Sequence, residues 1–166
     1  MKRVILALAL VCLAAISFAQ TAAPPDNPLP QNVYAGGVSY NNGASPAIAG
    51  TAMYARLVND GSGTYAFTVV DALPVSVKPF TVNTNIGLGV AQKIVTIGKA
   101  TVFVPTSAGI SFSGTNTGWQ WSTGALVSVP VKNNWRVFPN VRIVKSSVSA
   151  GAGYQPIVGV LVGWGQ

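Results

Sequence analysis

Apolar and polar residues alternate along most of this chain after residue 31, and one segment shows the pattern at unusual length. From Trp119 to Val131 every second residue is Trp, Thr, Ala or Val, and the positions between them are mostly Gln, Ser, Gly and Pro. Successive side chains of a strand point to opposite faces, so the pattern predicts one long strand with an apolar and a largely polar face. Trp119 and Trp121 lie together at one end of the apolar face, as occurs where a strand crosses a membrane interface.

Turn residues divide the rest of the chain into segments with the same period of two. Eight strands are predicted, over residues 33–41, 48–58, 64–73, 80–90, 101–113, 119–131, 135–148 and 156–164, and an extension of the fourth to residue 97 is left open. Asn59-Asp60-Gly61-Ser62-Gly63 is a strong hairpin turn. A proline-bounded loop over residues 73–79 is the best candidate for surface contact. No segment has helical periodicity.

The composition of the two faces predicts what surrounds these strands. In residues 80–90 one face carries Phe, Val, Ile and Leu, whereas the other carries Thr, Asn and Gly. A soluble barrel needs a charged exterior, but only 8% of the chain is charged, against roughly 25% in soluble domains. The sequence therefore predicts an all-β, eight-stranded antiparallel up-and-down transmembrane β-barrel, closed because strand edges cannot face lipid. A secreted soluble β-barrel or β-sandwich binding module is the alternative.

The first 19 residues have the organisation of a secretory signal peptide. Lys2 and Arg3 precede an apolar run over residues 4–16, and cleavage is expected before Gln20. The run is shorter than the roughly 20 residues that a transmembrane helix needs. A lipoprotein signal fits poorly, because Cys12 lies early in the run and follows a bulky valine. The predicted organisation is a signal peptide at 1–19, a Pro-rich linker at 20–31 and a β-barrel domain at 32–166.

Aromatic residues gather at the ends of the predicted strands. If both chain termini face the periplasm, they form one girdle at each rim of the barrel. The predicted membrane-interface aromatics are Tyr34, Tyr65, Trp135 and Trp164 at the inner rim, and Tyr40, Phe80, Phe112, Trp119 and Trp121 at the outer rim. Aromatic residues scattered through a sandwich core would not separate in this way by strand end.

The last predicted strand adds a resemblance to a known group of proteins. Val158, Val160, Val162 and Trp164 are similar to the alternating, aromatic-ended final strand of bacterial outer-membrane barrels, although Gly165 and Gln166 follow. Together with the other strands and the signal peptide, this segment resembles small eight-stranded bacterial outer-membrane β-barrel proteins (OmpA/OmpX and opacity type). The resemblance implies an outer-membrane location, contact with outer-membrane lipids and recognition of the C-terminal strand by the outer-membrane assembly machinery.

Candidate catalytic residues are scarce. The chain has no histidine, and its three acidic residues are Asp26, Asp60 and Asp71. Acid–base triads need a base that titrates near neutrality, and metal sites need His, Cys or clustered carboxylates. We therefore expect no enzymatic activity, no cofactor and no metal.

The basic residues leave a binding hypothesis open. The formal charge of +7 includes Lys2 and Arg3, so the chain after cleavage carries +5. The predicted lumen basic cluster is Arg56, Lys93, Arg136 and Arg142, which strand parity directs inward. These side chains either extend into hydrated barrel ends without a specific role, or make the interior weakly attractive to anions while rim lysines contact lipid phosphates.

No basic stripe with exposed aromatics accompanies this charge, so no nucleic-acid partner is expected. The sequence thus predicts a monomeric, non-enzymatic outer-membrane β-barrel with a structural or surface-interaction role and at most a narrow polar lumen.

Overall fold

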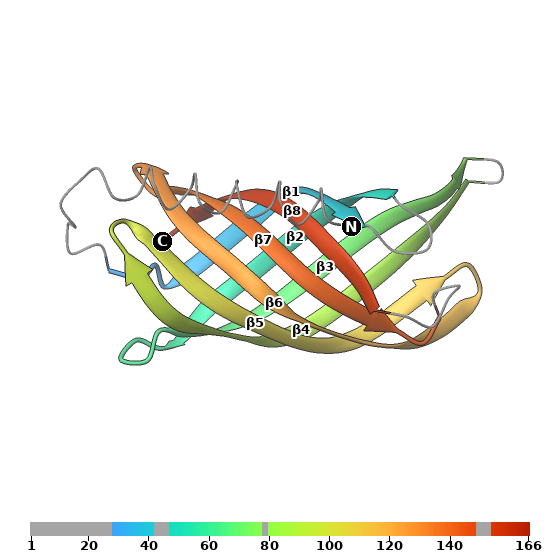
Figure 1. The fold of residues 1–166 in the computed structure, drawn as a ribbon, viewed down its shortest axis with the longest axis horizontal. Helices are drawn as coiled ribbons and strands as arrows, with labels where there is room; N and C mark the ends of the chain where they lie inside the picture. Colours follow the sequence, from blue (N-terminus) through green and yellow to red (C-terminus); the bar gives the residue numbers. More distant parts are fainter. Residues whose placement is uncertain (1–27, 42–46, 78–79, 149–153) are drawn as a thin grey trace.

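A closed antiparallel β-barrel of eight strands makes up the described part of the protein (Figure 1). This computed structural model describes residues 28–41, 47–77, 80–148 and 154–166. Among those residues no helix is long and apolar enough to cross a membrane. The predicted signal peptide, residues 1–19, and most of the predicted linker lie outside the described residues.

Each strand pairs with its neighbour in sequence, and the last pairs with the first. The strands are β1 (Asn32–Asn41), β2 (Ala47–Asn59), β3 (Thr64–Val77), β4 (Phe80–Ile97), β5 (Ala100–Ser113), β6 (Asn116–Lys132), β7 (Trp135–Ser146) and β8 (Tyr154–Gly165). All pairings are antiparallel. The strands are tilted against the long axis of the barrel (Figure 1). The all-β, eight-stranded antiparallel up-and-down barrel expected from the alternation is confirmed.

We name the two ends of the barrel by the turns and chain segments that lie there. We call the end with the turns at residues 60–63, 98–99 and 133–134 and the C-terminal Gln166 the near end. The opposite end, with residues 114–115 and 147–148, is the far end. In the orientation assumed for the aromatic girdles, the near end corresponds to the inner rim and the far end to the outer rim.

The third strand is longer than its prolines led us to expect. β3 continues through Pro74, which pairs with Val82 of β4, so the loop predicted from residue 73 is wrong at its start. Proline fits here because the register shifts directly after it, and because the pairs of β3 with β2 end at Ala72. A proline at a bulge with one free side removes no ladder hydrogen bond. Residues 78–79 lie outside the described part.

The end of the predicted linker is attached to the near end of the barrel. The backbone N–H of Leu57 donates to the carbonyl oxygen of Gln31 at 2.8 Å, and the Gln31 amide returns a hydrogen bond to Leu57 at 3.1 Å. The Tyr65 hydroxyl donates to the carbonyl oxygen of Pro30 at 2.7 Å. Leu29 packs against the apolar side chains inside the barrel. Residues 29–31 therefore lie across part of the near mouth.

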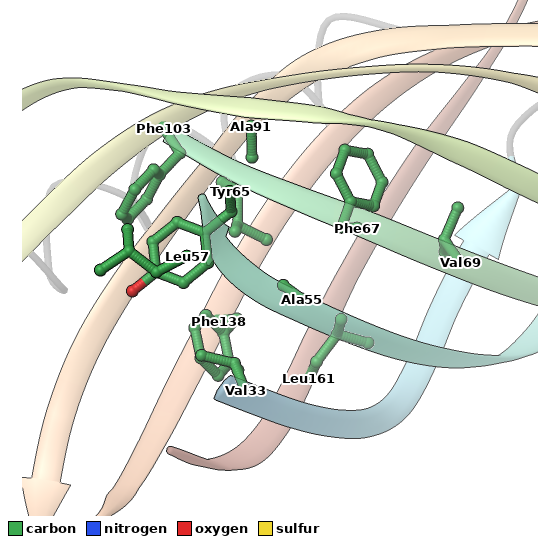
Figure 2. Close-up of a cluster of buried hydrophobic side chains, with 11 residues drawn as sticks. Val33, Ala55, Leu57, Tyr65, Phe67, Val69, Ala91, Phe103, Phe138 and Leu161 are labelled. Atoms are coloured by element: carbon green, nitrogen blue, oxygen red, sulfur yellow. The ribbon is translucent and has the colours of Figure 1, made fainter. Parts of the chain in front are cut away.

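Apolar side chains fill the near half of the barrel (Figure 2). Every strand contributes at least one member of this core cluster, which consists of Val33, Ala55, Leu57, Tyr65, Phe67, Val69, Ala91, Phe103, Leu126, Phe138 and Leu161. The rings of Tyr65 and Phe103 meet edge to face with their centroids 5.6 Å apart. The remaining cavity has a volume of about 50 Å³. The core cluster therefore closes the near half of the lumen.

Several glycines lie where a strand passes close to the backbone of its neighbour. A Cβ atom on Gly37, Gly89, Gly109 or Gly124 would collide with a backbone carbonyl oxygen of the paired strand, that of Val160, Thr106, Ile86 or Val141, respectively. Glycine at such positions lets strands bend sharply, which a small barrel needs for closure. The glycine-rich character of the inner face thus serves the curvature of the wall.

Candidate functional site

A hydrogen-bonded ion pair crosses the interior of the barrel. The Arg142 guanidinium donates from Nη2 to Oδ1 of Asp71 at 2.7 Å, and Asp71 is only 2% exposed. The Thr51 hydroxyl donates to the same carboxylate oxygen at 2.7 Å and lies 2.9 Å from Oγ of Ser39. Since β3 and β7 are four strands apart in a ring of eight, the ion pair joins opposite walls.

Other polar pairs line the same half of the interior. Hydroxyl and amide side chains of neighbouring strands form the hydrogen-bonded pairs Ser107–Ser122 at 2.8 Å, Ser111–Asn85 at 2.7 Å and Asn41–Gln155 at 2.9 Å. Most inward side chains of the far half are thus polar, apart from the buried Val144 and Ile157, whereas the near half holds the core cluster. The expected polar lumen is therefore restricted to one half of the barrel, because large apolar residues occupy the inner face of the other.

The structure places two members of the predicted lumen basic cluster, Arg136 and Arg142, inside the barrel and not the other two. Arg142 is neutralised by Asp71, one of the three acidic residues of the chain. Arg56 is exposed, which corrects its expected inward direction: Ala55 and Leu57 on either side are buried, so alternation turns Arg56 outward. Lys93 is half-buried against the turn at Gly63.

Arg136 is the remaining cation of the predicted cluster. It is buried, and its Nη1 donates to Oγ of Ser128 at 3.0 Å. Arg136 also lines a second cavity of about 300 Å³ at the near mouth, together with Gln31, Asp60 and Asn134. This guanidinium therefore lies at the boundary between the closed core and the polar near mouth, where water can solvate part of a long basic side chain.

A row of aromatic side chains surrounds part of the near rim. Trp135, Trp164, Tyr34 and Tyr54 are successive cross-strand partners on β7, β8, β1 and β2. Tyr34 and Tyr54 stack with centroids 5.0 Å apart, and Trp135 is 53% exposed. Sequence reasoning missed Tyr54, although it shares the outward parity of Ile48 and Val58 on the same strand.

Tyr65 does not belong to this near-rim row, contrary to the sequence-based expectation. It is only 5% exposed and belongs to the core cluster, because it shares its parity with the buried Phe67 and Val69. Tyr65 lies at the start of a strand, as a girdle residue would, but its side chain points into the barrel instead of toward the membrane interface.

The far rim carries the second group of aromatic residues. Tyr40, Phe112 and Trp119 are exposed, and Trp121 is half-buried and faces outward between the buried Gln120 and Ser122. The Phe80 side chain lies outside the described part of the structure. Sequence reasoning missed Tyr154, which is exposed and meets Trp121 edge to face at 6.0 Å.

The outer wall between these rims is apolar. Its exposed aliphatic residues include Val38, Ile48, Ile86, Leu88, Val90, Val104, Ile110, Ile143, Val160 and Val162. Leu88 has 69% of its surface exposed. Soluble monomers rarely expose apolar surface that extends over so many neighbouring elements.

Comparison with known proteins supports the fold and identifies no family. No family model matches the sequence, and neither does any curated protein sequence. A solved structure from work on the "De novo design of transmembrane beta-barrels" matches with a TM-score of 0.50 and 12% identity. The match covers 81% of this chain and 96% of the designed one. The chain, a closed eight-stranded barrel, therefore shares its fold with a designed transmembrane β-barrel. Its relation to the OmpA/OmpX and opacity type stays a prediction.

Proposed function

We propose that the protein is a non-enzymatic β-barrel of the bacterial outer membrane, with a structural or surface-interaction role. The observation that carries this proposal is the apolar outer wall bounded by aromatic residues at both ends. Outer-membrane barrels have this arrangement: an apolar band faces the lipid tails and aromatic girdles lie at the two interfaces. The designed transmembrane barrel that shares the fold supports the same proposal.

The closed interior supports a role other than diffusion of solutes. An eight-stranded barrel has an interior just wide enough for side chains. Here the core cluster fills the near half, and the Arg142–Asp71 ion pair crosses the lumen beyond it. We therefore propose a barrel that does not conduct.

The remaining parts of the proposal concern location and partners. The signal peptide at residues 1–19 directs export, the outer wall contacts outer-membrane lipids, and β8 is recognised by the outer-membrane assembly machinery. The near end faces the periplasm, and the protein is a monomer. The outward residues of β8 that support recognition are Val158, Val160, Val162 and Trp164, which alternate with the buried Ile157, Gly159, Leu161 and Gly163.

Cell fractionation distinguishes this proposal from the soluble alternative. The full chain, expressed in a Gram-negative host, is expected in the outer-membrane fraction and to need detergent for extraction. Without heating it is expected to migrate as a compact species on a denaturing gel, because a closed barrel resists detergent until heated. A denatured sample of the same preparation is the control. Recovery in the soluble periplasmic or extracellular fraction without detergent contradicts the membrane barrel and favours a secreted β-barrel binding module.

Reconstitution into planar bilayers tests whether the lumen conducts. The purified full chain is expected to produce no stepwise conductance above that of empty bilayers, because apolar side chains from every strand close the near half. A general porin reconstituted in the same lipid is the positive control. Stable channels, seen in preparations that also migrate as folded barrels, contradict the closed-lumen proposal.

A further inference from the structure

We propose that Lys145, at the far rim, holds a phosphate group of an anionic membrane lipid. The site consists of Lys145 on β7, Trp119 and Trp121 on β6, and Tyr154 on β8, and we call it the rim lysine site. It rests on the proposed function, because the lipid reaches this surface only if the barrel lies in a bilayer.

The strand register brings the rim lysine site together on the outer wall. Trp121 pairs with Lys145, and Lys145 pairs with Tyr154, so these three side chains form one row across β6, β7 and β8. The Lys145 ammonium lies 5.3 Å from the centre of the Tyr154 ring and 6.0 Å from that of Trp119. Both cation–ring contacts recorded in the described residues belong to Lys145. The rings hold the ammonium at the rim and leave its N–H donors for an acceptor.

The backbone beside the site is tied to the end of β7. The Trp119 N–H donates to Oγ of Ser147 at 2.9 Å, and the Ser147 N–H donates to the Trp119 carbonyl oxygen at 3.0 Å. A Cβ on Gly118 would meet the Ser147 hydroxyl, so a larger residue here would require the Ser147 side chain to move. The backbone of Trp119 is therefore fixed to the chain that follows β7.

No described carboxylate competes for the Lys145 ammonium. Asp71 is buried inside the barrel in its ion pair with Arg142, and Asp60 lies in a turn at the near end. The ammonium therefore lacks a negative partner within the described residues, and an anion from outside the chain can supply one.

The surroundings of Lys145 favour a lipid as the source of that anion. Ile143, two residues away on the same outward face of β7, is 45% exposed and belongs to the apolar wall. The ammonium thus lies where the apolar wall meets the aromatic rim, the level at which phospholipid headgroups border the lipid tails. A phosphate placed on Lys145 leaves the acyl chains of the same molecule against the neighbouring apolar residues.

Tryptophan quenching by brominated lipids tests this proposal. Two of the chain's four tryptophans, Trp135 and Trp164, are replaced by phenylalanine, which leaves Trp119 and Trp121 as reporters. The full chain is reconstituted into phosphatidylcholine–phosphatidylglycerol vesicles in which one or the other lipid carries bromine. The electrostatic attraction between one basic residue and an anionic membrane surface amounts to a preference of about fivefold for the anionic lipid over the neutral one. We expect that preference at these tryptophans and its loss in Lys145→Gln.

Lys132→Gln is the matched control, because Lys132 is exposed at the opposite end of β6 and its loss changes the net charge equally. This variant is expected to keep the preference for phosphatidylglycerol. A preference that survives in Lys145→Gln, or that Lys132→Gln removes equally, overturns the rim lysine site. Loss of the preference on adding millimolar inorganic phosphate at constant ionic strength assigns the site to free phosphate and overturns the lipid assignment. Absence of quenching by either lipid instead refutes membrane insertion, and with it the proposed function.

Discussion

Replacing Asp71 with alanine is expected to destabilise the barrel by about 3–5 kcal/mol, because removal of one partner leaves the other charge of a buried ion pair uncompensated. Arg142 is buried on the opposite wall, and Asp71 is its ion-pair partner in the described residues. The Thr51 hydroxyl loses its acceptor in the same variant. Urea unfolding of the barrel in lipid vesicles, followed by tryptophan fluorescence, measures the change.

A double variant separates the ion pair from packing effects. Asp71→Leu/Arg142→Met removes both charges, and we expect it to recover much of the stability that Asp71→Ala loses, because an apolar replacement of a buried ion pair is often close to neutral. Asp60→Ala removes an acid from an exposed turn and is expected to change little. If Asp71→Ala unfolds at the same urea concentration as Asp60→Ala, the ion pair does not stabilise the barrel.

The outward face of the barrel could be predicted from the sequence because lipid imposes one chemistry on it. Val158, Val160 and Val162 are not buried, and the residues between them are, as the alternation indicated. The interior follows no such single rule, since some of its side chains fill space and others pair with each other. On β3 both faces carry apolar residues, so period two alone could not show that Tyr65 points inward.

The interior ion pair could not be predicted for a different reason. Asp71 and Arg142 are 71 residues apart, and their contact depends on which strands face each other after closure. Strand parity gave the correct inward direction of Arg142. The direction of Arg56 required knowing that Ala55 and Leu57 belong to the core cluster.

The size of the apolar core also could not be predicted from the alternation of residues within single strands. Phe103 and Phe138 lie on different strands, and each is the single aromatic residue on the inner face of its strand. Only closure of the sheet brings them into one cluster with members from all strands (Figure 2). A lumen inferred strand by strand therefore looked more polar than the assembled one.

Substituting alanine for Gly109 is expected to destabilise the barrel by roughly 3 kcal/mol, at the upper end of the usual range for overpacking. A Cβ at this position would collide with the Ile86 carbonyl oxygen and would approach Cα of Gly87 to 2.7 Å. Both obstacles are backbone atoms of the paired strand β4, so no side-chain rotation relieves the collision. Relief requires β4 and β5 to separate, which opens ladder hydrogen bonds of a closed sheet.

Gly50→Ala is the matched control, because a Cβ on Gly50 of β2 meets nothing within 4 Å. That variant is expected to stay within about 0.5 kcal/mol of the parent protein. Urea midpoints in vesicles, and the fraction of unheated protein that migrates as a folded barrel, measure both variants. Equal stability of Gly109→Ala and Gly50→Ala would mean that the close approach of β4 and β5 is not needed for closure. A selective loss in Gly109→Ala would show that the inner-face glycines are required because they bend the wall, whatever the polarity of the lumen.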